Sequence, residues 1–353
     1  MKVLLVHPGT EFSIQDVWQG IYDALVRANV DVVQYDLSGR MVFAGRYLDY
    51  VYRLARKHGT TKEKPTPGDM LYLSAVGMLE RALRHRADWI ILISGNYIHP
   101  AALDLCHQAG IRTCVILTET PYSNEQETEI AKLSDVVFTN ERAYQDMFRP
   151  LCHEVHYYQH AYDPSRQGVQ DNELAEDTPR HDVVFVGTGF EERCDILSGV
   201  NWDGIDLGLY GSWSLFGSRS KMRKFIRAKT IKNELTVQLY RNAKIGLNLH
   251  RTSRGYGRHV EHVTGAESMN PRCYELAGTG TFFITDTRPE VTETFGDLVP
   301  TFETSRELED QIRYWLGHEE ERRQVAAKLP EAIAAHTFDD RVSKVIDVLT
   351  HFN

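Results

Sequence analysis

The stretch Glu267-Ser-Met-Asn270-Pro-Arg272-Cys-Tyr-Glu275-Leu-Ala-Gly-Thr-Gly280 carries the most informative local signals of the chain. Asn270 followed by Pro271 predicts a helix start, because asparagine caps free backbone N–H groups and proline needs no such donor. Those N–H groups and the positive end of the helix dipole would suit a phosphate, and Arg272 adds a fixed charge. Glu275 follows about one turn later, where a carboxylate can accept hydrogen bonds from a ribose diol. The alternative is an ordinary capped helix with solvated charges.

Short apolar runs before and after this stretch predict an α/β fold. Runs of four to seven residues rich in Val, Ile and Phe are typical of buried parallel strands, and helical patterns separate them. The strand-like runs are 3–6, 89–93, 113–117, 136–139, 183–186, 245–249 and 281–284, and the helical patterns include 16–28, 77–85, 100–108, 305–316, 319–329 and 340–349.

The alternation of strands and helices runs twice, which predicts two domains. The first series ends near Val155, and the polar segment 163–182 is interpreted as a linker before a new strand opens at Val183. We therefore expect an N-terminal domain over 1–162, a C-terminal domain over 163–335, and a last helix, 336–353, that crosses back to the N-terminal domain.

Composition restricts the class of protein. A chain of 353 residues fits two domains, and its net charge of −9 argues against nucleic-acid binding by overall charge, though not against a local basic patch. The five cysteines are scattered without a C-x-x-C pair, so neither a zinc site nor a disulfide framework is indicated. The longest apolar run, 89–93, is far short of the roughly 20 residues of a membrane span. We expect a cytoplasmic protein with no membrane span.

A family resemblance rests on the spacing of two glutamates. Glu267 and Glu275 are separated by seven residues, which resembles the E-x7-E pattern of retaining GT-B glycosyltransferases of the family-4 type. The wider sequence resembles the CgeB-like (spore maturation protein) subgroup in the segments 118–122, 135–140, 182–187, 243–250, 270–286, 307–322 and 336–341. The resemblance covers most of the chain from about residue 85 onward and leaves 41–70 unplaced.

The resemblance implies a GT-B architecture, in which two Rossmann-like domains have parallel sheets that face a central cleft. It implies a hexosyl- or pentosyltransferase that moves a sugar from a nucleotide-diphosphate sugar, UDP-linked, to an acceptor hydroxyl with retention of configuration. No metal and no tightly bound cofactor are expected. By the same resemblance Glu275 would hold the ribose, Arg272 and the helix start at Asn270 would hold the diphosphate, and Glu267 would lie near the donor sugar.

Gly187-Thr188-Gly189, behind the strand at 183–186, is a second candidate for the donor site. Small residues after a strand let the backbone approach a phosphate or sugar closely. The dinucleotide fingerprint G-x-G-x-x-G would need glycine where Glu192 stands, so a nicotinamide site is disfavoured. A plain tight turn is as consistent with the residues, and the resemblance favours the donor site.

The segment 248–258 is rich in Arg and Gly and follows a buried strand. Cations there would suit the leaving diphosphate, whose charge grows in the transition state, and Arg251 is the best candidate. His250 is assigned to the nucleotide-binding residues. The alternative is a solvated basic loop. The neighbouring run 259–262, His-Val-Glu-His, is not the H-E-x-x-H of a zinc enzyme and lacks an evident third ligand, so a metal is disfavoured.

Three residues of the N-terminal half are candidates for the acceptor side. His7 and Gly9 follow the first strand, and Glu119 follows the strand at 113–117. A buried histidine without a catalytic part is the alternative for His7. If configuration is retained, the leaving phosphate can take the proton of the acceptor, so no dedicated base is required.

The segment 219–232 contains seven cations and no acid. The ordinary interpretation is a solvated helix face, and the alternative is a docking patch for a polyanionic acceptor such as nucleic acid or an anionic polymer. This leaves open a nucleic-acid-binding protein, or a transferase acting on hydroxylated DNA bases. A sugar-nucleotide epimerase or hydrolase with the GT-B fold is a further alternative.

Overall fold

The computed structural model describes residues 1–9, 14–60, 63–169 and 177–352, and the chain forms two compact units. The first contains Met1–Tyr158 and Arg341–Asn353, and the second contains Gln159–Asp340. The chain therefore leaves the first unit at Tyr158, a few residues before the expected boundary. Within the expected linker 163–182, helix α7 (Pro164–Gln167) belongs to the second unit. Residues 170–176 of that linker lie outside the described residues.

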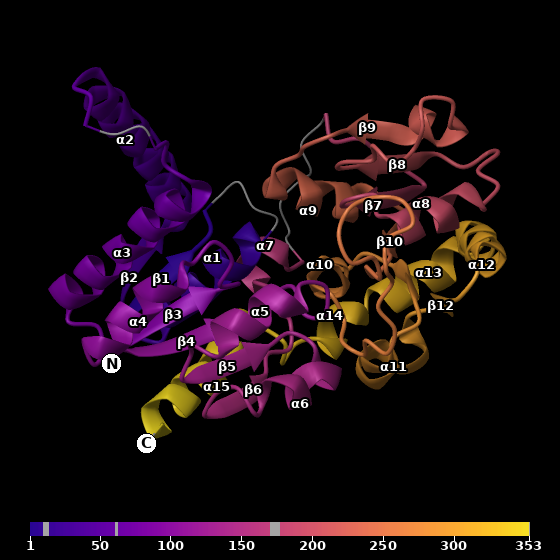
Figure 1. Ribbon diagram of the computed structural model, residues 1–353. Coiled ribbons are helices and arrows are strands. Elements are labelled where there is room, and N and C mark those ends of the chain that lie inside the picture. Colours follow the sequence, from indigo (N-terminus) through magenta and orange to yellow (C-terminus); the bar gives the residue numbers. More distant parts are fainter. Residues whose placement is uncertain (10–13, 61–62, 170–176, 353) are drawn as a thin grey trace. The chain divides into compact units, whose positions relative to one another are not determined.

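The first unit is built on a parallel sheet with the strand order β2-β1-β3-β4-β5-β6 (Figure 1). Every residue of β3 is buried, as expected for a strand covered on both faces. The strands are β1 (Lys2–His7), β2 (Asp31–Asp36), β3 (Trp89–Ile93), β4 (Arg112–Ile116), β5 (Val136–Thr139) and β6 (Glu154–Tyr157).

Helices connect these strands, and the last helix of the chain completes the first unit. The Phe352 ring packs edge-on against Trp89 at 5.3 Å, and Arg112 donates to the Phe352 carbonyl at 2.9 Å. The helices are α1 (Gln15–Arg27), α2 (Leu37–Lys57), α3 (Pro67–His85), α4 (Pro100–Gln108), α5 (Asn124–Ala131), the short η1 (Arg142–Tyr144) and α6 (Gln145–Phe148), and α15 (Phe338–His351), which enters the unit at Arg341.

The second unit repeats the design with the strand order β12-β11-β10-β7-β8-β9, again parallel. The first strand, β7, lies between β8 and β10, so the chain builds outward on one side of β7 and then on the other. The strands are β7 (Val183–Val186), β8 (Leu207–Tyr210), β9 (Ile226–Ala228), β10 (Ile245–Asn248), β11 (Phe283–Asp286) and β12 (Thr301–Phe302).

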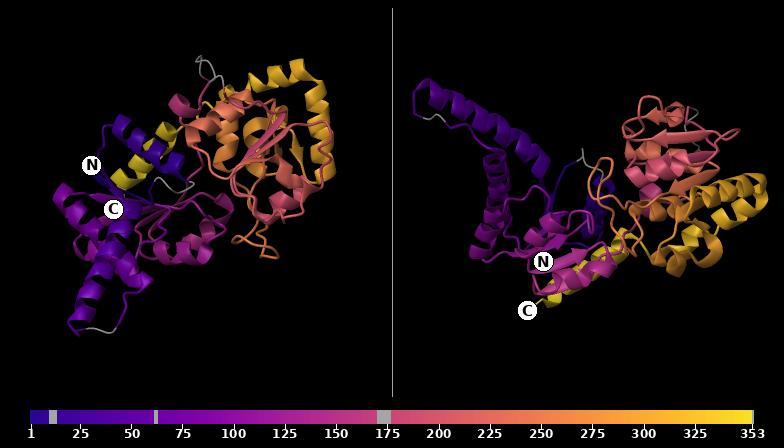
Figure 2. Two further views of the ribbon diagram at one scale, coloured as in Figure 1. Left: turned by 90° about the horizontal axis from the view of Figure 1, so that it is seen from above. Right: turned by 45° about the vertical axis from the view of Figure 1, so that its right-hand side comes forward.

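The helices of the second unit enclose that sheet (Figure 2). Its core contains large aromatic side chains, among them Phe185, Trp213 and Phe283, which are buried. The helices are α7, α8 (Glu191–Ser198), η2 (Lys221–Phe225), α9 (Asn233–Asn242), α10 (Pro271–Gly278), α11 (Pro289–Phe295), η3 (Gly296–Leu298), α12 (Ser305–Gly317), α13 (Glu319–Ala326) and α14 (Leu329–Ala332).

The expected strands and helices are present, with shifted ends in several places. The strand expected at 281–284 begins two residues later, and the helix expected at 77–85 begins already at Pro67. No helix of the described residues is both long enough and apolar enough to cross a lipid bilayer.

Candidate donor site

The carboxyl ends of β7 and β10 form the point of the second unit at which ligands are expected. In an open parallel sheet, ligands bind where neighbouring strands lead the chain in opposite directions, because the loops that follow them separate and leave a crevice. β7 and β10 are such neighbours in the second unit. Gly187 follows β7 directly, and Leu249 and His250 follow β10, so two predicted site segments meet at this edge.

Helix α10 begins where the sequence predicts. Asn270 has an extended backbone, with φ −86° and ψ 166°, and its side chain accepts a hydrogen bond from the Cys273 N–H at 3.3 Å. Pro271 occupies the first turn. The predicted helix start is therefore confirmed. Near its end, a Cβ at Gly278 would lie 2.7 Å from the Gln167 carbonyl oxygen, so only glycine lets α10 approach α7 this closely.

Arg272 connects α10 to the carboxyl ends of both strands. Its Nε donates to the Val186 carbonyl at 2.8 Å, and its Nη1 donates to Asn248 Oδ1 at 3.1 Å. The guanidinium lies 4.5 Å from the ring centroid of Phe185. Among the described residues no carboxylate lies within 4 Å of this guanidinium, so its charge is held by neutral partners only. A fixed, uncompensated positive charge therefore lies at the switch point of the sheet.

The glycine loop after β7 lies against this arginine. A Cβ at Gly187 would lie 2.5 Å from Arg272 Nη2, and the φ of Gly187, +151°, is one that other residues rarely adopt. Packing explains the glycine at position 189, because a Cβ there would lie 2.3 Å from the Trp213 ring. The carbonyl of Thr188, between them, accepts a hydrogen bond from Arg193 Nη1 at 2.8 Å. The structure thus brings the Gly187–Gly189 loop and Arg272 together.

Three buried polar residues orient the end of β10. Asn248 is fully buried and donates from Nδ2 to Thr285 Oγ1 at 2.9 Å. His250 is 4% exposed, and both its backbone N–H and its Nδ1 lie within 2.9 Å of Asp286 Oδ1. Burial lowers the pKa of His250, an effect that the charge of Asp286 opposes. These bonds fix His250 and with it the start of the loop that follows.

Asp286 keeps its charge in this partly buried position. Burial would raise the pKa of its carboxyl, but the charge of His250 and the two hydrogen bonds from that residue hold the pKa below its usual value. Sequence reasoning missed Asn248 and Asp286 as site residues. A polar residue that ends an otherwise apolar strand was the available signal for each.

Arg251 lies over the ring of Phe190, with its guanidinium carbon 4.4 Å from the ring centroid, and its Nε donates to the Ser253 carbonyl at 2.7 Å. The basic loop is anchored from α8, where Glu192 accepts from the Thr252 N–H at 2.8 Å and from the Ser253 hydroxyl. Arg251 is thus tied into the same edge of the sheet, and its part in catalysis remains a prediction.

Two buried arginines lie in this region. Arg288 is 8% exposed, and its Nη1 and Nη2 donate to the carbonyls of Ala266 and Arg251 at 2.5 and 3.3 Å. Its Nε is buried, and no hydrogen-bond partner for it occurs among the described residues. Arg193, also buried, donates to the Leu249 carbonyl at 3.0 Å. Both arginines are bound to backbone carbonyls, so they stabilise the loops of this edge while keeping it electropositive.

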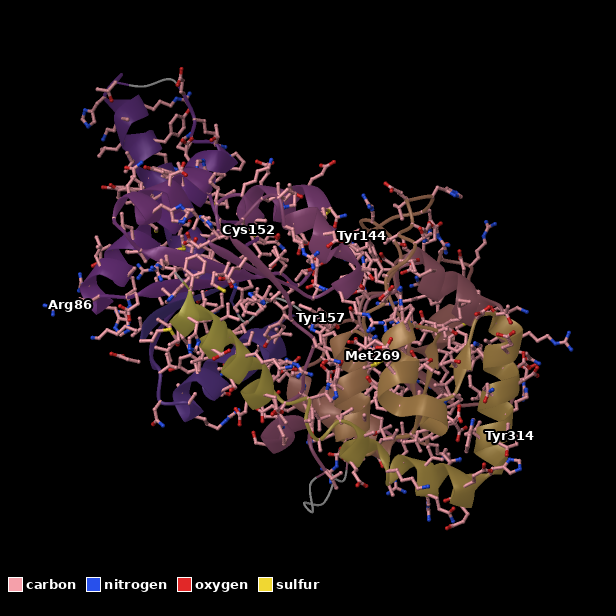
Figure 3. The ribbon with its side chains drawn as sticks, turned by 90° about the horizontal axis from the view of Figure 1, so that it is seen from below. Arg86, Tyr144, Cys152, Tyr157, Met269 and Tyr314 are labelled. Atoms are coloured by element: carbon pink, nitrogen blue, oxygen red, sulfur yellow. The ribbon has the colours of Figure 1, made fainter. Side chains whose placement is uncertain are left out.

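Glu267 precedes α10 and is fixed through its backbone. Its carbonyl accepts the Glu290 N–H at 3.2 Å at the start of α11. The buried Glu290 carboxylate in turn accepts the N–H of Met269 at 2.6 Å and the amide of Gln159 at 2.9 Å. Figure 3 labels Met269, one residue before the helix cap. The segment from Glu267 to Asn270 is thereby held in place, while the predicted contact of Glu267 with the sugar stays a prediction.

Glu275 lies on α10 three residues beyond Arg272 and is partly buried. Residues three apart on a helix lie on the same face, so the two predicted nucleotide contacts are neighbours on α10. The assignment of Glu275 to a ribose stays a prediction.

The run 259–262 has structural partners. His262 Nδ1 forms a hydrogen bond of 2.8 Å with the Thr252 hydroxyl, and His262 Nε2 lies 3.5 Å from the Glu191 carboxylate. The Glu261 carboxylate lies 3.6 Å from Arg254 Nε. These contacts tie the basic loop to α8 and to itself.

In the first unit, His7 and Gly9 form one packed corner behind β1. His7 is 4% exposed and stacks on Trp18 with ring centroids 3.9 Å apart. Its Nδ1 accepts the Gly9 N–H at 3.2 Å, and Trp18 Nε1 donates to the Gly9 carbonyl at 3.1 Å. Burial lowers the pKa of His7, against the opposing charge of Asp36. These contacts favour the structural alternative for His7, and its acceptor-side role is an untested prediction.

Glu119 lies in a loop that a buried carboxylate holds. Glu127, on α5, is 1% exposed and accepts the Glu119 N–H at 3.0 Å and the Thr120 hydroxyl at 2.7 Å. Asn140 fixes the other side of the loop by exchanging two hydrogen bonds with the Thr120 backbone, at 3.0 and 3.2 Å. Burial raises the pKa of the Glu127 carboxyl to about 7, even though both donors favour its charged form. Sequence reasoning missed Glu127 altogether.

The cations of 219–232 are exposed as expected, but only Lys221, Arg223 and Lys224 lie on a helix, the short 3-10 helix η2, so the expectation of one continuous helix face was wrong. They lie on η2, on the edge strand β9 and on the loops beside them, and all of their side chains are exposed. Arg227 pairs with Asp206 at 2.7 Å. Met222 and Phe225 of η2 are buried, and the cations occupy the exposed positions around them and on β9.

The sequence of the chain is similar to that of known proteins. Residues 176–347 match the family described as glycosyl transferase-like. The spore protein CgeB of Bacillus subtilis (strain 168) is 20% identical over 264 residues, which cover 73% of this chain and 81% of CgeB. Together these matches support a CgeB-like glycosyltransferase with the GT-B fold. The suspected resemblance, the α/β GT-B fold class and the expectation of a glycosyltransferase are thereby confirmed, and the nucleic-acid-binding alternative is not favoured.

Solved structures show the same fold at low sequence identity. Sucrose-phosphate synthase from Thermosynechococcus elongatus has a TM-score of 0.62 at 11% identity, with 99% of this chain and 98% of that chain covered. A trehalose-6-phosphate structure from E. coli, bound with UDP-2-fluoro glucose, has a TM-score of 0.62 at 10% identity, with both chains covered in full.

Proposed function

We propose that this glycosyltransferase binds a nucleotide-diphosphate sugar, UDP-linked, at the switch point between β7 and β10. The observation that carries the proposal is Arg272, whose guanidinium is fixed by Val186, Asn248 and the Phe185 ring. A charge that is fixed before the ligand arrives stabilises a diphosphate without further reorganisation, which makes it effective in a transition state. The UDP-sugar bound to the E. coli structure of the same fold supports this class of donor.

In this proposal, helix α10 supplies the nucleotide end of the site. The positive end of its dipole and Arg272 hold the diphosphate, with Asn270 as the cap that fixes the turn. Glu275, on the same face of α10, accepts hydrogen bonds from the ribose hydroxyls. The Gly187–Gly189 loop lets the backbone approach the diphosphate, since a side chain at Gly187 would occupy the space beside Arg272.

The sugar end is proposed to lie at Glu267 and Arg251. Arg251 stabilises the charge that grows on the leaving diphosphate, and Arg288 and His250 hold the loop that carries it. With retention of configuration, the departing phosphate oxygen takes the proton of the acceptor hydroxyl as the new glycosidic bond forms. The chain then needs no separate base. The reaction proposed here requires no metal.

A panel of nucleotide sugars tests this function. Thermal-shift measurements with UDP-, GDP- and ADP-sugars should show stabilisation by a UDP-sugar, because a ligand that binds only the folded state raises its melting temperature. The best donor is then incubated with the enzyme without an acceptor, and the products are analysed for isomerised or free sugar. Slow hydrolysis at most supports a transferase. Rapid isomerisation would contradict it and support an epimerase that uses the same pocket.

A further inference from the structure

Helix α2 of the first unit exposes an apolar stripe that the fold leaves uncovered. Phe43, Tyr47, Tyr50 and Leu54 follow one another at intervals of four, three and four residues and are 60%, 49%, 65% and 45% exposed. The rings of Phe43 and Tyr47 stack on each other at 6.1 Å. Isolated exposed apolar side chains are ordinary, but a continuous stripe along a helix marks an interaction surface.

The stripe is separate from the face by which α2 packs against its own unit. Leu37 and Ala44, about a quarter to a third of a turn around the helix from the stripe, are buried, and Gly45 lies against Met70 of α3. Figures 1 and 2 show the α2–α3 hairpin extending beyond the sheet of its own unit. The stripe and the helix tip lie within 41–70, the part of the chain that the family resemblance leaves unplaced.

Cations flank the stripe. Helix α2 carries five Arg or Lys residues and a single acid, Asp49. Projected at about 100° per residue, Arg46, Arg53 and Lys57 lie directly beside the apolar side chains. Arg53 pairs with Asp49 at 2.6 Å. Arg46 and Lys57 are exposed, and neither has a carboxylate partner among the described residues.

We propose that this face of α2 docks on an anionic lipid surface. An amphipathic helix with aromatic residues on one face and arginines and lysines beside them inserts its apolar face at the headgroup boundary, while the cations meet lipid phosphates. Tyr47 and Tyr50 suit that boundary, because a tyrosine ring is apolar and its hydroxyl remains in the wet layer. A second copy of the chain would oppose like charges across the same stripe, which makes self-association the poorer match. The surface thus directs the first unit to a membrane.

Vesicle sedimentation with the full chain tests the proposal. The wild-type protein should sediment with vesicles of phosphatidylcholine and phosphatidylglycerol, and much less with phosphatidylcholine alone. Phe43→Ser with Tyr47→Ser should raise the lipid concentration for half-binding by roughly tenfold or more. Arg46→Gln with Lys57→Gln should raise it by roughly fivefold for each cation and remove much of the salt dependence.

Val26→Ser, on α1, is the matched control, since Val26 is 48% exposed and lies outside the stripe. It should bind vesicles as the wild type does, and all variants should keep their melting temperature because the changed side chains are exposed. Absence of wild-type binding to anionic vesicles, or unchanged binding by the Phe43/Tyr47 variant, would overturn the proposal. Light scattering tests whether the stripe instead binds a second copy of the chain. A dimeric wild type, together with a monomeric Phe43/Tyr47 variant whose vesicle binding is unchanged, would assign the stripe to self-association and contradict the proposal.

Discussion

Arg272 Nη1 and Asn248 Oδ1 lie 3.1 Å apart, which joins the first turn of α10 to the last residue of β10. Asn248 is fully buried and also donates to Thr285 Oγ1, so its orientation is fixed before any ligand arrives. The sheet therefore fixes the position of the Arg272 charge through Asn248.

Replacing Arg272 by alanine should lower sugar transfer by an order of magnitude or more, because the departing diphosphate loses a positioned charge. The variant should also lose on the order of 1–3 kcal/mol of stability, since its hydrogen bonds to Val186 and Asn248 disappear. Steady-state kinetics well below the melting temperature separates the two effects. Arg306→Ala, an exposed change on α12, is the control. Wild-type turnover in Arg272→Ala would remove Arg272 from the site.

Gly187→Ala should weaken donor binding, because the new Cβ would lie 2.5 Å from Arg272 Nη2 at a φ of +151°. The guanidinium would have to leave its place or the loop would have to shift. Gly217→Ala is the matched control, since a Cβ there meets nothing within 4 Å. Calorimetric titration of both variants with UDP checks this. Equal affinities would show that the loop has no part in the site.

Glu127→Gln should change how stability depends on pH. Burial raises the pKa of Glu127 to about 7, above its unfolded value of 4.5, so folding of the wild type is penalised as pH rises from about 4.5 to about 7. The glutamine variant lacks this penalty. Its free energy of unfolding, relative to wild type, should therefore increase between pH 5 and pH 8, by an amount on the order of 1–3 kcal/mol. Urea unfolding at both pH values measures it, and a difference independent of pH would refute the assignment.

Local chemistry explains which parts of the site could be predicted. The start of α10 depends on Asn270 and Pro271 alone, so capping rules found it. The capping box of Thr66 and Asp69 is an equally local signal for the start of α3. Buried strands such as β3 were visible because their apolar runs are continuous.

Long-range pairing explains what the sequence did not reveal. Asn248 meets Thr285 only because β10 and β11 are neighbours in register, and Arg272 meets Val186 only because β7 lies beside β10. Glu127 accepts the Glu119 N–H only because the fold places α5 beside the loop that carries Glu119. The edge strand β9 has three residues, one of them the exposed Arg227, and is too short to show an alternation that would distinguish it from a helix.

Calorimetric titration of UDP into the wild type, Glu275→Ala and Glu234→Ala tests the donor site most directly. Glu234 is an exposed acid in the first turn of α9 and serves as the matched control. Loss of hydrogen bonds between a carboxylate and a ribose should weaken UDP binding by about tenfold or more in Glu275→Ala, with Glu234→Ala unchanged. Unchanged UDP affinity in Glu275→Ala would contradict the placement of the nucleotide on α10.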